Sequence, residues 1–322
     1  IKRRKTTKAS RAVPLNPQKT PVDWLRFRVK DEPPAIIEAH RPAYGHIGEH
    51  LSLHKLERGI LGFQQACSIN VGDMPLGRMD FCGESQREWV RVDFGGKGCE
   101  WMQDWSEIRR VEEMESAQLR RLDIALTTWE GQITHDMVVQ AHTAGRFTIR
   151  RPPELRQITS SDPRAGRTCY IGKRDADKFM RCYEKGFEMA AKYASRVPGE
   201  VMRVGENAVG DIYRCEGEFK ATATDIPWEV IERRDQYFAG AYPFCADILP
   251  GVEADILMRR PEREPQIDLK AALDNCRIQF GPTLFTALTA YHGDIMAVWD
   301  KVIGKQHNQT LLEAGVLLVD HD

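Results

Sequence analysis

The chain has 322 residues, a formal net charge of −1, 42% hydrophobic and 29% charged residues, and a mean hydropathy of −0.48. A chain of this length can bury a large core, as one big domain with an appendage or as two domains. No apolar run approaches the roughly 18 residues that a membrane helix needs, which excludes an integral membrane protein of the helical class.

Positive charge gathers in two segments although the total is close to zero. The first eleven residues carry six cations and no acid, and residues 145–185 carry 11 Lys or Arg against 5 Asp or Glu. Residues 246–322 carry 7 cations against 12 acids. We therefore expect a basic arm and a basic central segment able to neutralise backbone phosphates, although a solvated surface explains the central segment equally well.

The eight cysteines and nine histidines form no metal motif. The cysteines are scattered without a CxxC, several of them inside apolar segments, and the histidines show no HxH or HExxH. Buried free thiols in a reducing cytoplasm fit this pattern.

Hydrophobic periodicity predicts the elements in chain order. Residues 1–20 are polar, basic and interrupted by proline, which indicates a flexible tail. Alternation of apolar and polar residues predicts strands over 22–29, 78–82, 89–94, 119–126, 169–171, 179–183 and 212–220. The strands over 169–171 and 179–183 are expected to pair as a hairpin. Helices are predicted over 106–115, 133–144, 187–194, 268–280 and 283–303, whereas 49–66 is ambiguous between helix and loop.

Strands separated by isolated helices, without regular βαβ alternation, favour an α+β fold. We predict an antiparallel central sheet flanked by helices, with a small helical C-terminal region. The expected domains are a tail over 1–20, a catalytic domain over 21–245 and an acidic helical region over 246–322. No internal repeat is apparent in the sequence.

Two tyrosines lie among cations in the central segment. On a strand, Arg181, Tyr183 and Lys185 share one face, and Tyr170 precedes them on the other arm of the hairpin. A phenol can attack a phosphodiester if flanking cations favour the phenolate and hold the phosphate. Alternatively, both tyrosines pack their rings and the cations are solvated.

Three carboxylates form the second group of candidates. Glu216 and Glu218 share a strand face, and Asp123 lies within an apolar strand where an unpaired carboxylate is costly. Oxygen ligands of this kind suit Mg²⁺ or Mn²⁺. The alternatives are an ion pair between Asp123 and Arg121, and an exposed strand of alternating charge for the two glutamates.

Taken in order, short motifs along the chain resemble the replication initiation factors of rolling-circle plasmids and filamentous phages and the related relaxases of conjugative elements. The resemblance runs from about residue 22 to residue 240. It rests on Val22-Asp-Trp-Leu, Val92-Asp-Phe-Gly-Gly-Lys-Gly-Cys99, Arg121-Leu-Asp-Ile-Ala125, Tyr170-Ile-Gly-Lys-Arg174, Arg181-Cys-Tyr-Glu-Lys185 and Tyr213-Arg-Cys-Glu216.

The resemblance implies a metal-dependent nickase that cuts one strand of origin DNA and rejoins it through a 5′-phosphotyrosine. Tyr183 matches the tyrosine position, with Tyr170 in reserve, and Arg181 and Lys185 become phosphate contacts. Asp123 and Glu216, joined by Glu218, become ligands of Mg²⁺ or Mn²⁺. Further DNA contacts are expected from the central cations Arg150, Arg151, Lys173, Arg174 and Lys178.

One position departs from the family pattern. A second acid often follows four residues after Asp123, and this chain has Thr127 there, so Glu184 or Glu218 would have to complete the ligand set. The expected partners are single-stranded or hairpin origin DNA, a host helicase and a polymerase, with a possible homodimer and no membrane. The alternatives are a non-catalytic DNA-binding replication or regulatory protein on the same fold, and an accidental resemblance.

Overall fold

The computed structural model describes residues 19–86, 88–194, 202–222, 224–257, 269–308 and 311–312. The chain divides between Arg259 and Arg260 into two units, and each is described by itself. The basic arm and most of the expected tail, residues 1–18, lie outside the described residues.

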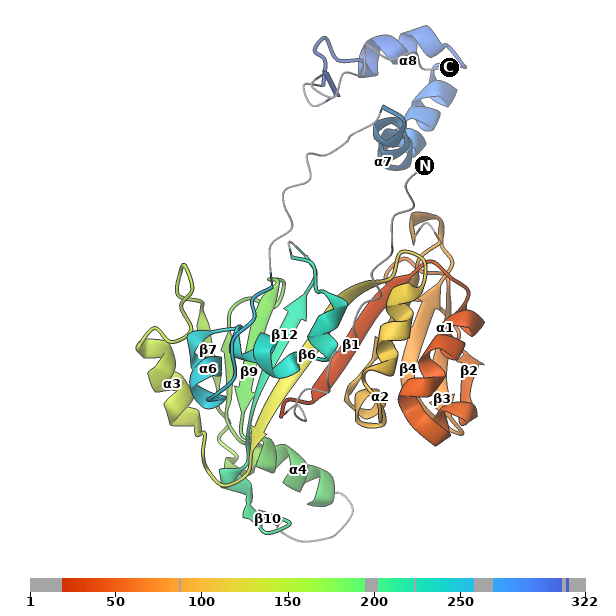
Figure 1. Ribbon diagram of the computed structural model, residues 1–322. Helices are drawn as coiled ribbons and strands as arrows, with labels where there is room; N and C mark the ends of the chain where they lie inside the picture. The colour runs from red at the N-terminus through yellow and green to blue at the C-terminus, as the bar shows by residue number, and fades with distance from the viewer. Residues whose placement is uncertain are drawn as a thin grey trace, which may run out of the picture. The chain divides into compact units, whose positions relative to one another are not determined.

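The first unit is built on one ten-stranded antiparallel sheet (Figure 1), which confirms the predicted α+β class and antiparallel pairing. The strand order is β2-β3-β4-β5-β1-β6-β12-β9-β8-β7. The first five strands are β1 (Val22–Val29), β2 (Leu51–Lys55), β3 (Gln65–Val71), β4 (Met74–Phe81) and β5 (Val90–Phe94). The others are β6 (Gln118–Thr128), β7 (Leu155–Ile158), β8 (Thr168–Ile171), β9 (Lys178–Tyr183) and β12 (Tyr213–Lys220), with β10 (Arg203–Val204) and β11 (Asn207–Ala208) paired separately.

The sheet consists of two halves with the same topology. In the first half, β1 lies at the centre of the sheet, β2 at the outer edge, and β3, β4 and β5 fill the positions from that edge back to β1. In the second half, β6 lies at the centre, β7 at the outer edge, and β8, β9 and β12 fill the positions back to β6. The central strands β1 and β6 are antiparallel, so an approximate two-fold axis perpendicular to the sheet relates the halves. The expectation of no internal repeat is therefore wrong at the level of the fold.

Short sequence segments carry the same repeat. Helix α1 (Pro33–His40) contains Ile-Ile-Glu-Ala-His, and α3 (His135–Thr143) contains Val-Val-Gln-Ala-His at positions 102 later. Strand β3 contains Ala-Cys-Ser-Ile, and β8 contains Thr-Cys-Tyr-Ile at the same interval. Between β9 and β12 the second half has additional chain that includes α4 (Lys185–Ala194). This difference in spacing conceals the repeat in the sequence.

One face of the sheet is buried and the other is open. On β1, Leu25 and Phe27 are fully buried, whereas the alternate residues Trp24 and Arg26 are half-buried, as the period of two requires. Helix α1 packs on the buried face, where His40 stacks on Phe27 with ring centroids 5.1 Å apart. Since the two-fold axis is perpendicular to the sheet, both halves present equivalent positions on the open face.

The remaining elements of the first unit are short. They are α2 (Gly96–Glu100), α5 (Arg234–Ala239), α6 (Pro243–Ile248) and the 3₁₀ helices η1 (Arg41–His50), η2 (Glu84–Gln86), η3 (Glu107–Glu113), η4 (Pro163–Ala165), η5 (Val209–Asp211) and η6 (Trp228–Ile231). The helix expected over 106–115 is thus a 3₁₀ helix. The segment 49–66, expected as helix or loop, contains the end of η1, the strand β2 and the first residues of β3. We expected the C-terminal region to begin at 246, but the division lies later because Leu249 is buried in the core and Asp255 pairs with Arg233.

The second unit is helical, as predicted. Helix α7 (Leu269–Ala290) runs through Pro282, where two separate segments were expected, and α8 (Ile295–Val302) follows after a turn. Asp294 caps α8 by accepting a hydrogen bond from the Ala297 amide at 3.0 Å. In the described part of the chain, no helix combines the length and apolar character that a bilayer-spanning segment requires.

Candidate active site

A pocket of about 280 Å³ opens on the open face where β1, β6, β12 and β9 lie side by side. We call it the carboxylate pocket, because Asp23, Asp123, Glu216 and Glu218 line it together with Arg121, Arg174 and Arg181. The strand register brings these residues together: Asp123 lies opposite Glu218, and Glu216 lies opposite Arg181. All three predicted metal ligands therefore share one cavity.

Arg121 holds two of the carboxylates. Its Nε and Nη2 donate to both oxygens of Asp123 at 2.8 and 2.6 Å, and Nη2 also reaches Glu218 at 3.2 Å. Lys220 pairs with the other Glu218 oxygen at 2.5 Å. The alternative interpretation of Asp123 as an ion-pair partner of Arg121 is thus realised. Burial nevertheless raises the pKa of Asp123 to about 6, despite the opposing effect of Arg121.

Glu216 has no such partner. Its Oε2 atom is buried without a hydrogen-bond partner. Burial, followed by the negative charges of Asp23 and Asp123, raises the pKa of Glu216 to about 7. A buried carboxylate without a partner costs free energy, and a cation placed beside it would remove that cost.

These residues fit a divalent cation that is shared with a substrate. Among the described residues, no three His, Cys, Asp or Glu side chains are gathered closely enough to form a complete metal site. Mg²⁺, however, is commonly held by one or two carboxylates and completes its octahedron with water and phosphate oxygens. Glu216, with Asp123 and Asp23 as its acidic neighbours, is the donor set that fits such an ion.

Tyr183 is buried beside the pocket between two cations. It is 4% exposed, with the Arg181 guanidinium 4.0 Å and the Lys185 ammonium 5.5 Å from its ring centroid. We expected these cations to favour the phenolate. That expectation is wrong, because burial raises the pKa of Tyr183 above its ordinary value and outweighs the nearby positive charges.

Tyr170 occupies the more accessible position. It lies opposite Arg181 on β8 and is only half-buried. Its ring is 5.5 Å from that of Phe179 and 5.3 Å from the Arg174 guanidinium. Phe179, Arg174 and Arg181 all line the carboxylate pocket, so Tyr170 stands at its border.

Two of the lysines predicted to contact DNA do not line the carboxylate pocket. Lys178 points to the buried side of the sheet, where its ammonium donates to the Ala241 carbonyl and lies 4.2 Å from the Tyr242 ring centroid. Burial lowers the pKa of Lys178 to about 8, and its position on the buried side of the sheet disfavours the expected DNA contact. Lys185 pairs with Glu188 at 2.7 Å.

The expected surface cations are exposed, but only one of them lines the carboxylate pocket. Lys173 lies in the turn between β8 and β9, and Arg150 and Arg151 lie between α3 and β7. Arg174 follows Lys173 in the same turn and lines the pocket.

Thr127, which stands where members of the family often have a second acid, has a different role. The Thr127 hydroxyl accepts a hydrogen bond from Arg214 at 2.8 Å, and the same guanidinium pairs with Asp23 at 3.1 Å. Glu184 does not line the carboxylate pocket, and it binds Arg167 at 2.9 Å. Asp23 is the fourth carboxylate of the pocket, and the sequence-based prediction missed it. Its only sequence signal was its place in Val22-Asp-Trp-Leu.

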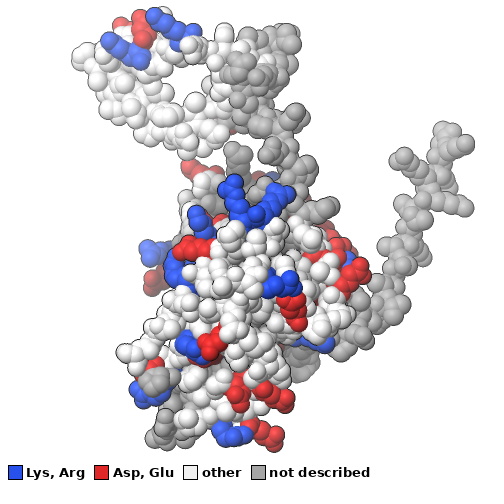
Figure 2. Space-filling model, turned by 90° about the vertical axis from the view of Figure 1, so that its left-hand side faces the viewer, with Lys and Arg blue, Asp and Glu red and all other residues white. Residues whose placement is uncertain are grey.

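The basic central segment is largely neutralised within the first unit. Its arginines pair with nearby acids in the pairs Arg146–Asp247, Arg156–Glu154, Arg164–Asp162, Arg167–Glu184 and Arg167–Asp136. On the face shown in Figure 2, Lys and Arg side chains are interspersed with Asp and Glu. The cations of this segment that line the carboxylate pocket are Arg174 and Arg181.

Comparison with known proteins supports the resemblance seen in the motifs. Residues 117–264 match the model of the replication initiation factor family. The match begins just before β6, so it covers the half of the sheet that carries the two tyrosines and three of the four carboxylates. The predicted resemblance is confirmed over this segment.

A solved structure shares the fold. The chain is similar to the rolling circle replication initiator protein from Geobacillus stearothermophilus, with a TM-score of 0.52 and 19% sequence identity. The alignment covers 74% of this chain and 99% of the other. No curated protein matches the chain.

Proposed function

We propose that this chain, whose residues 117–264 match the replication initiation factors, nicks and rejoins one strand of origin DNA through a 5′-phosphotyrosine. The observation that carries the proposal is the carboxylate pocket. It combines the buried, unpartnered Oε2 atom of Glu216 with Arg174 and Arg181, and Tyr170 lies next to both of these arginines. A phosphodiester transfer needs a nucleophile, positive charge around the phosphate and a site for a divalent cation.

We assign the nucleophile to Tyr170. Its hydroxyl oxygen would form a bond to phosphorus as the bond to the 3′ oxygen breaks, and that oxygen takes up a proton to leave as a 3′ hydroxyl. Tyr170 is half-buried and therefore accessible to a DNA strand in the pocket, whereas the side chain of Tyr183 is only 4% exposed. The buried Tyr183 instead packs its ring on Arg181 and keeps that guanidinium in place.

The other residues of the pocket would stabilise the negative charge of the reacting phosphate or hold the cation that does so. Arg181 and Arg174 would stabilise the negative charge that develops on the phosphate oxygens. Mg²⁺ or Mn²⁺ bound at Glu216 and Asp123 would supply Lewis acidity. Arg121 holds Asp123 and Glu218 in fixed orientations, so the pocket is organised before DNA arrives.

The setting in which this reaction occurs belongs to the same proposal. A polymerase would extend the released 3′ hydroxyl while a host helicase separates the strands, and a reducing cytoplasm suits the eight free cysteines. The second unit exposes Phe285 and Trp299, which are 72% and 53% exposed, as side chains through which two copies could pair.

A denaturing gel tests the reaction. Labelled single-stranded oligonucleotides from the candidate origin are incubated with the protein and Mg²⁺ or Mn²⁺, and covalent adducts are detected by their shift. We expect an adduct with wild type and with Tyr193→Phe, an exposed tyrosine on α4 that serves as the control. Tyr170→Phe should abolish the adduct.

The same gel separates the alternatives. Loss of the adduct with Tyr183→Phe but not with Tyr170→Phe would keep the reaction and return the nucleophile to Tyr183. Specific binding by wild type without an adduct under either metal would contradict the nickase and favour the non-catalytic DNA-binding protein.

A further inference from the structure

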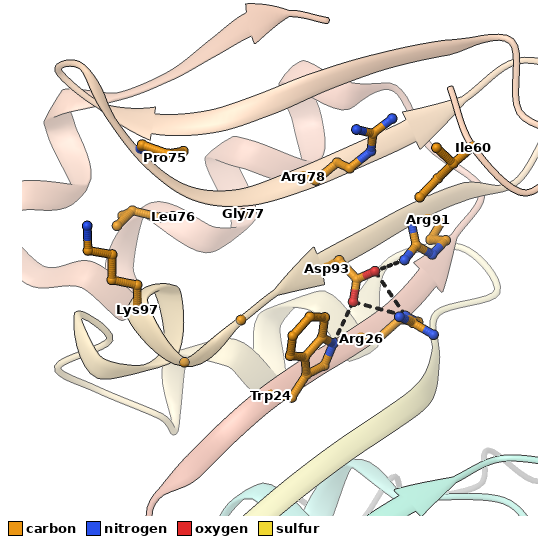
Figure 3. A pocket seen from close by; sticks show the side chains of 12 residues that line it. Trp24, Arg26, Ile60, Pro75, Leu76, Gly77, Arg78, Arg91, Asp93 and Lys97 are labelled. Atoms are coloured by element: carbon orange, nitrogen blue, oxygen red, sulfur yellow. Dashed lines mark hydrogen bonds and ion pairs between the residues drawn. The ribbon is translucent and has the colours of Figure 1, made fainter. Parts of the chain in front are cut away.

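A second pocket lies on the open face in the other half of the sheet, formed mainly by β4, β5 and β1 (Figure 3). Its volume is about 580 Å³. We call it the arginine pocket, because Arg26, Arg78 and Arg91 line it together with Lys97. It adjoins the carboxylate pocket, since Trp24 and Gly96 line both.

The strand register makes the arginine pocket the two-fold equivalent of the carboxylate pocket. Across the second half of the sheet, one row of opposed residues reads Tyr170, Arg181, Glu216 and Ala125. The corresponding row of the first half, counted through the equivalent strands, reads Ser68, Arg78, Asp93 and Arg26. An arginine and an acid are kept at the same two places.

The groups assigned to catalysis are replaced in the first half. Ser68 stands at the place of Tyr170, so the proposed nucleophile is missing. Trp24 is opposite Asp123 across the two-fold axis and is its equivalent. Continuing the register puts Gly95 at the place of Glu218, and the Trp24 ring lies 3.4 Å from where a Cβ atom at Gly95 would be. Two of the carboxylates thus give way to an indole and a glycine.

The charge of the pocket changes accordingly. Four carboxylates and three arginines line the carboxylate pocket, whereas four cations and one carboxylate, Asp93, line the arginine pocket. Arg26 and Arg91 both pair with Asp93, as Figure 3 shows. Asp80 pairs with Arg78 at 2.8 Å and with Arg91 at 2.6 Å, which still leaves positive charge in excess.

Two details indicate that an anion is the ligand. The Nε atom of Arg91 is buried without a hydrogen-bond partner. Lys97 is exposed and reaches the pocket from α2.

We infer that the arginine pocket binds the phosphodiester backbone of a second segment of the same DNA strand and does not cleave it. This inference rests on the proposed function, because it takes single-stranded DNA as the ligand of the open face. The duplicated half then serves as a holding site that keeps one part of the strand bound while the other is cut and rejoined.

The separation of the pockets sets the length of strand that both can bind. Arg181 on β9 and Arg78 on β4 are five strand spacings apart, about 24 Å at the ordinary spacing of strands. That distance corresponds to about seven nucleotides at the 3.4 Å rise of a B-form strand. An oligothymidine of about 3 nucleotides is therefore too short to contact both arginines, and one of about 16 nucleotides spans both pockets.

Fluorescence anisotropy with these two labelled oligothymidines tests the inference. Wild type is compared with Lys97→Glu, Arg78→Ala and the control Arg110→Ala, an exposed arginine on η3. We expect Lys97→Glu to weaken binding of both oligonucleotides about tenfold, because the short strand binds first at the pocket with the larger positive charge, and Arg110→Ala to leave both affinities unchanged. The slope of log affinity against log salt concentration for the long strand should become shallower by about 0.7 for each phosphate that the variant no longer neutralises.

The outcomes distinguish this inference from the nickase proposal. Lys97 is exposed, so its variant should fold, and the melting temperature checks this for Arg78→Ala. If Lys97→Glu and Arg78→Ala, folded as wild type, bind both oligonucleotides as tightly as wild type does, the holding site is wrong. A failed nickase would appear in the adduct gel, while the dependence of affinity on strand length could still hold.

Discussion

Glu216 gives the sharpest prediction about stability. Burial and the neighbouring acids raise its pKa from the ordinary 4.5 to about 7, so the folded protein holds a proton on Glu216 that the unfolded chain has already lost. Between pH 4.5 and 7 the folded state binds more protons than the unfolded state, and stability therefore falls as the pH rises. Above pH 7 the penalty is constant at no more than about 3 kcal/mol, since one pKa unit corresponds to about 1.4 kcal/mol.

The substitution Glu216→Gln removes this penalty without changing the shape of the side chain. We expect the variant to be more stable than wild type by up to about 3 kcal/mol at pH 8, and by less than about 0.5 kcal/mol at pH 4.5. Urea denaturation at the two pH values measures the difference. The exposed Glu113→Gln is the matched control and should give the same stability as wild type at both.

Two results would refute this reasoning. A Glu216→Gln variant no more stable than wild type at pH 8 would mean that the carboxylate is ionised without cost. A gain equal at both pH values would mean that the effect is not electrostatic. Adding Mg²⁺ at pH 8 should stabilise wild type more than the variant, since an ion that binds only the folded state shifts the equilibrium towards it.

Three further substitutions follow from the contacts. Arg121→Gln leaves Asp123 and Glu218 without their guanidinium, so we expect a loss of roughly 3 kcal/mol in urea denaturation at pH 8 and a smaller loss at pH 5, where Asp123 is protonated. Lys178→Met should change the affinity for single-stranded DNA less than twofold by anisotropy, because the ammonium faces the Ala241 carbonyl; a large loss would place Lys178 on the DNA. Gly98→Ala puts a Cβ atom 2.2 Å from the Leu76 carbonyl oxygen and should lower thermal stability by roughly 2 kcal/mol, whereas Gly210→Ala, with no atom within 4 Å, should not.

The sequence predicted those elements whose side chains alternate or recur every three to four residues. Strands β1, β5, β6 and β12 and the β8–β9 hairpin appear where the period of two indicated them. Strands β2, β3 and β7 were missed: β2 and β7 lie at the sheet edges, where one face is exposed and the alternation is weak, whereas β3 lies inside the sheet between β2 and β4. Helix α1, with two prolines at its start, was also missed.

The candidate site was predicted in its composition but not in its electrostatics. The motifs selected Asp123, Glu216, Glu218 and Arg181, and strand register does bring them together. The pKa of Tyr183 could not be predicted, because burial depends on how β9 packs and not on the residues beside it in sequence.

The repeat escaped for a related reason. The matched positions differ in chemistry, as Ser68 and Tyr170 do, and additional chain in the second half shifts the later strands out of register. The order of strand pairing reveals the repeat, and the short matching segments at an interval of 102 residues then become recognisable in the sequence.

The central claim is that Tyr170 becomes linked to DNA, and peptide mapping of the adduct tests it most directly. After reaction with an origin oligonucleotide, nuclease digestion and trypsin leave the two tyrosines in different peptides, Thr168-Cys-Tyr-Ile-Gly-Lys173 and Cys182-Tyr-Glu-Lys185. We predict that mass spectrometry finds the nucleotide on the first of these peptides. A nucleotide on the second would contradict the assignment of the nucleophile, and a nucleotide on neither would contradict the reaction itself.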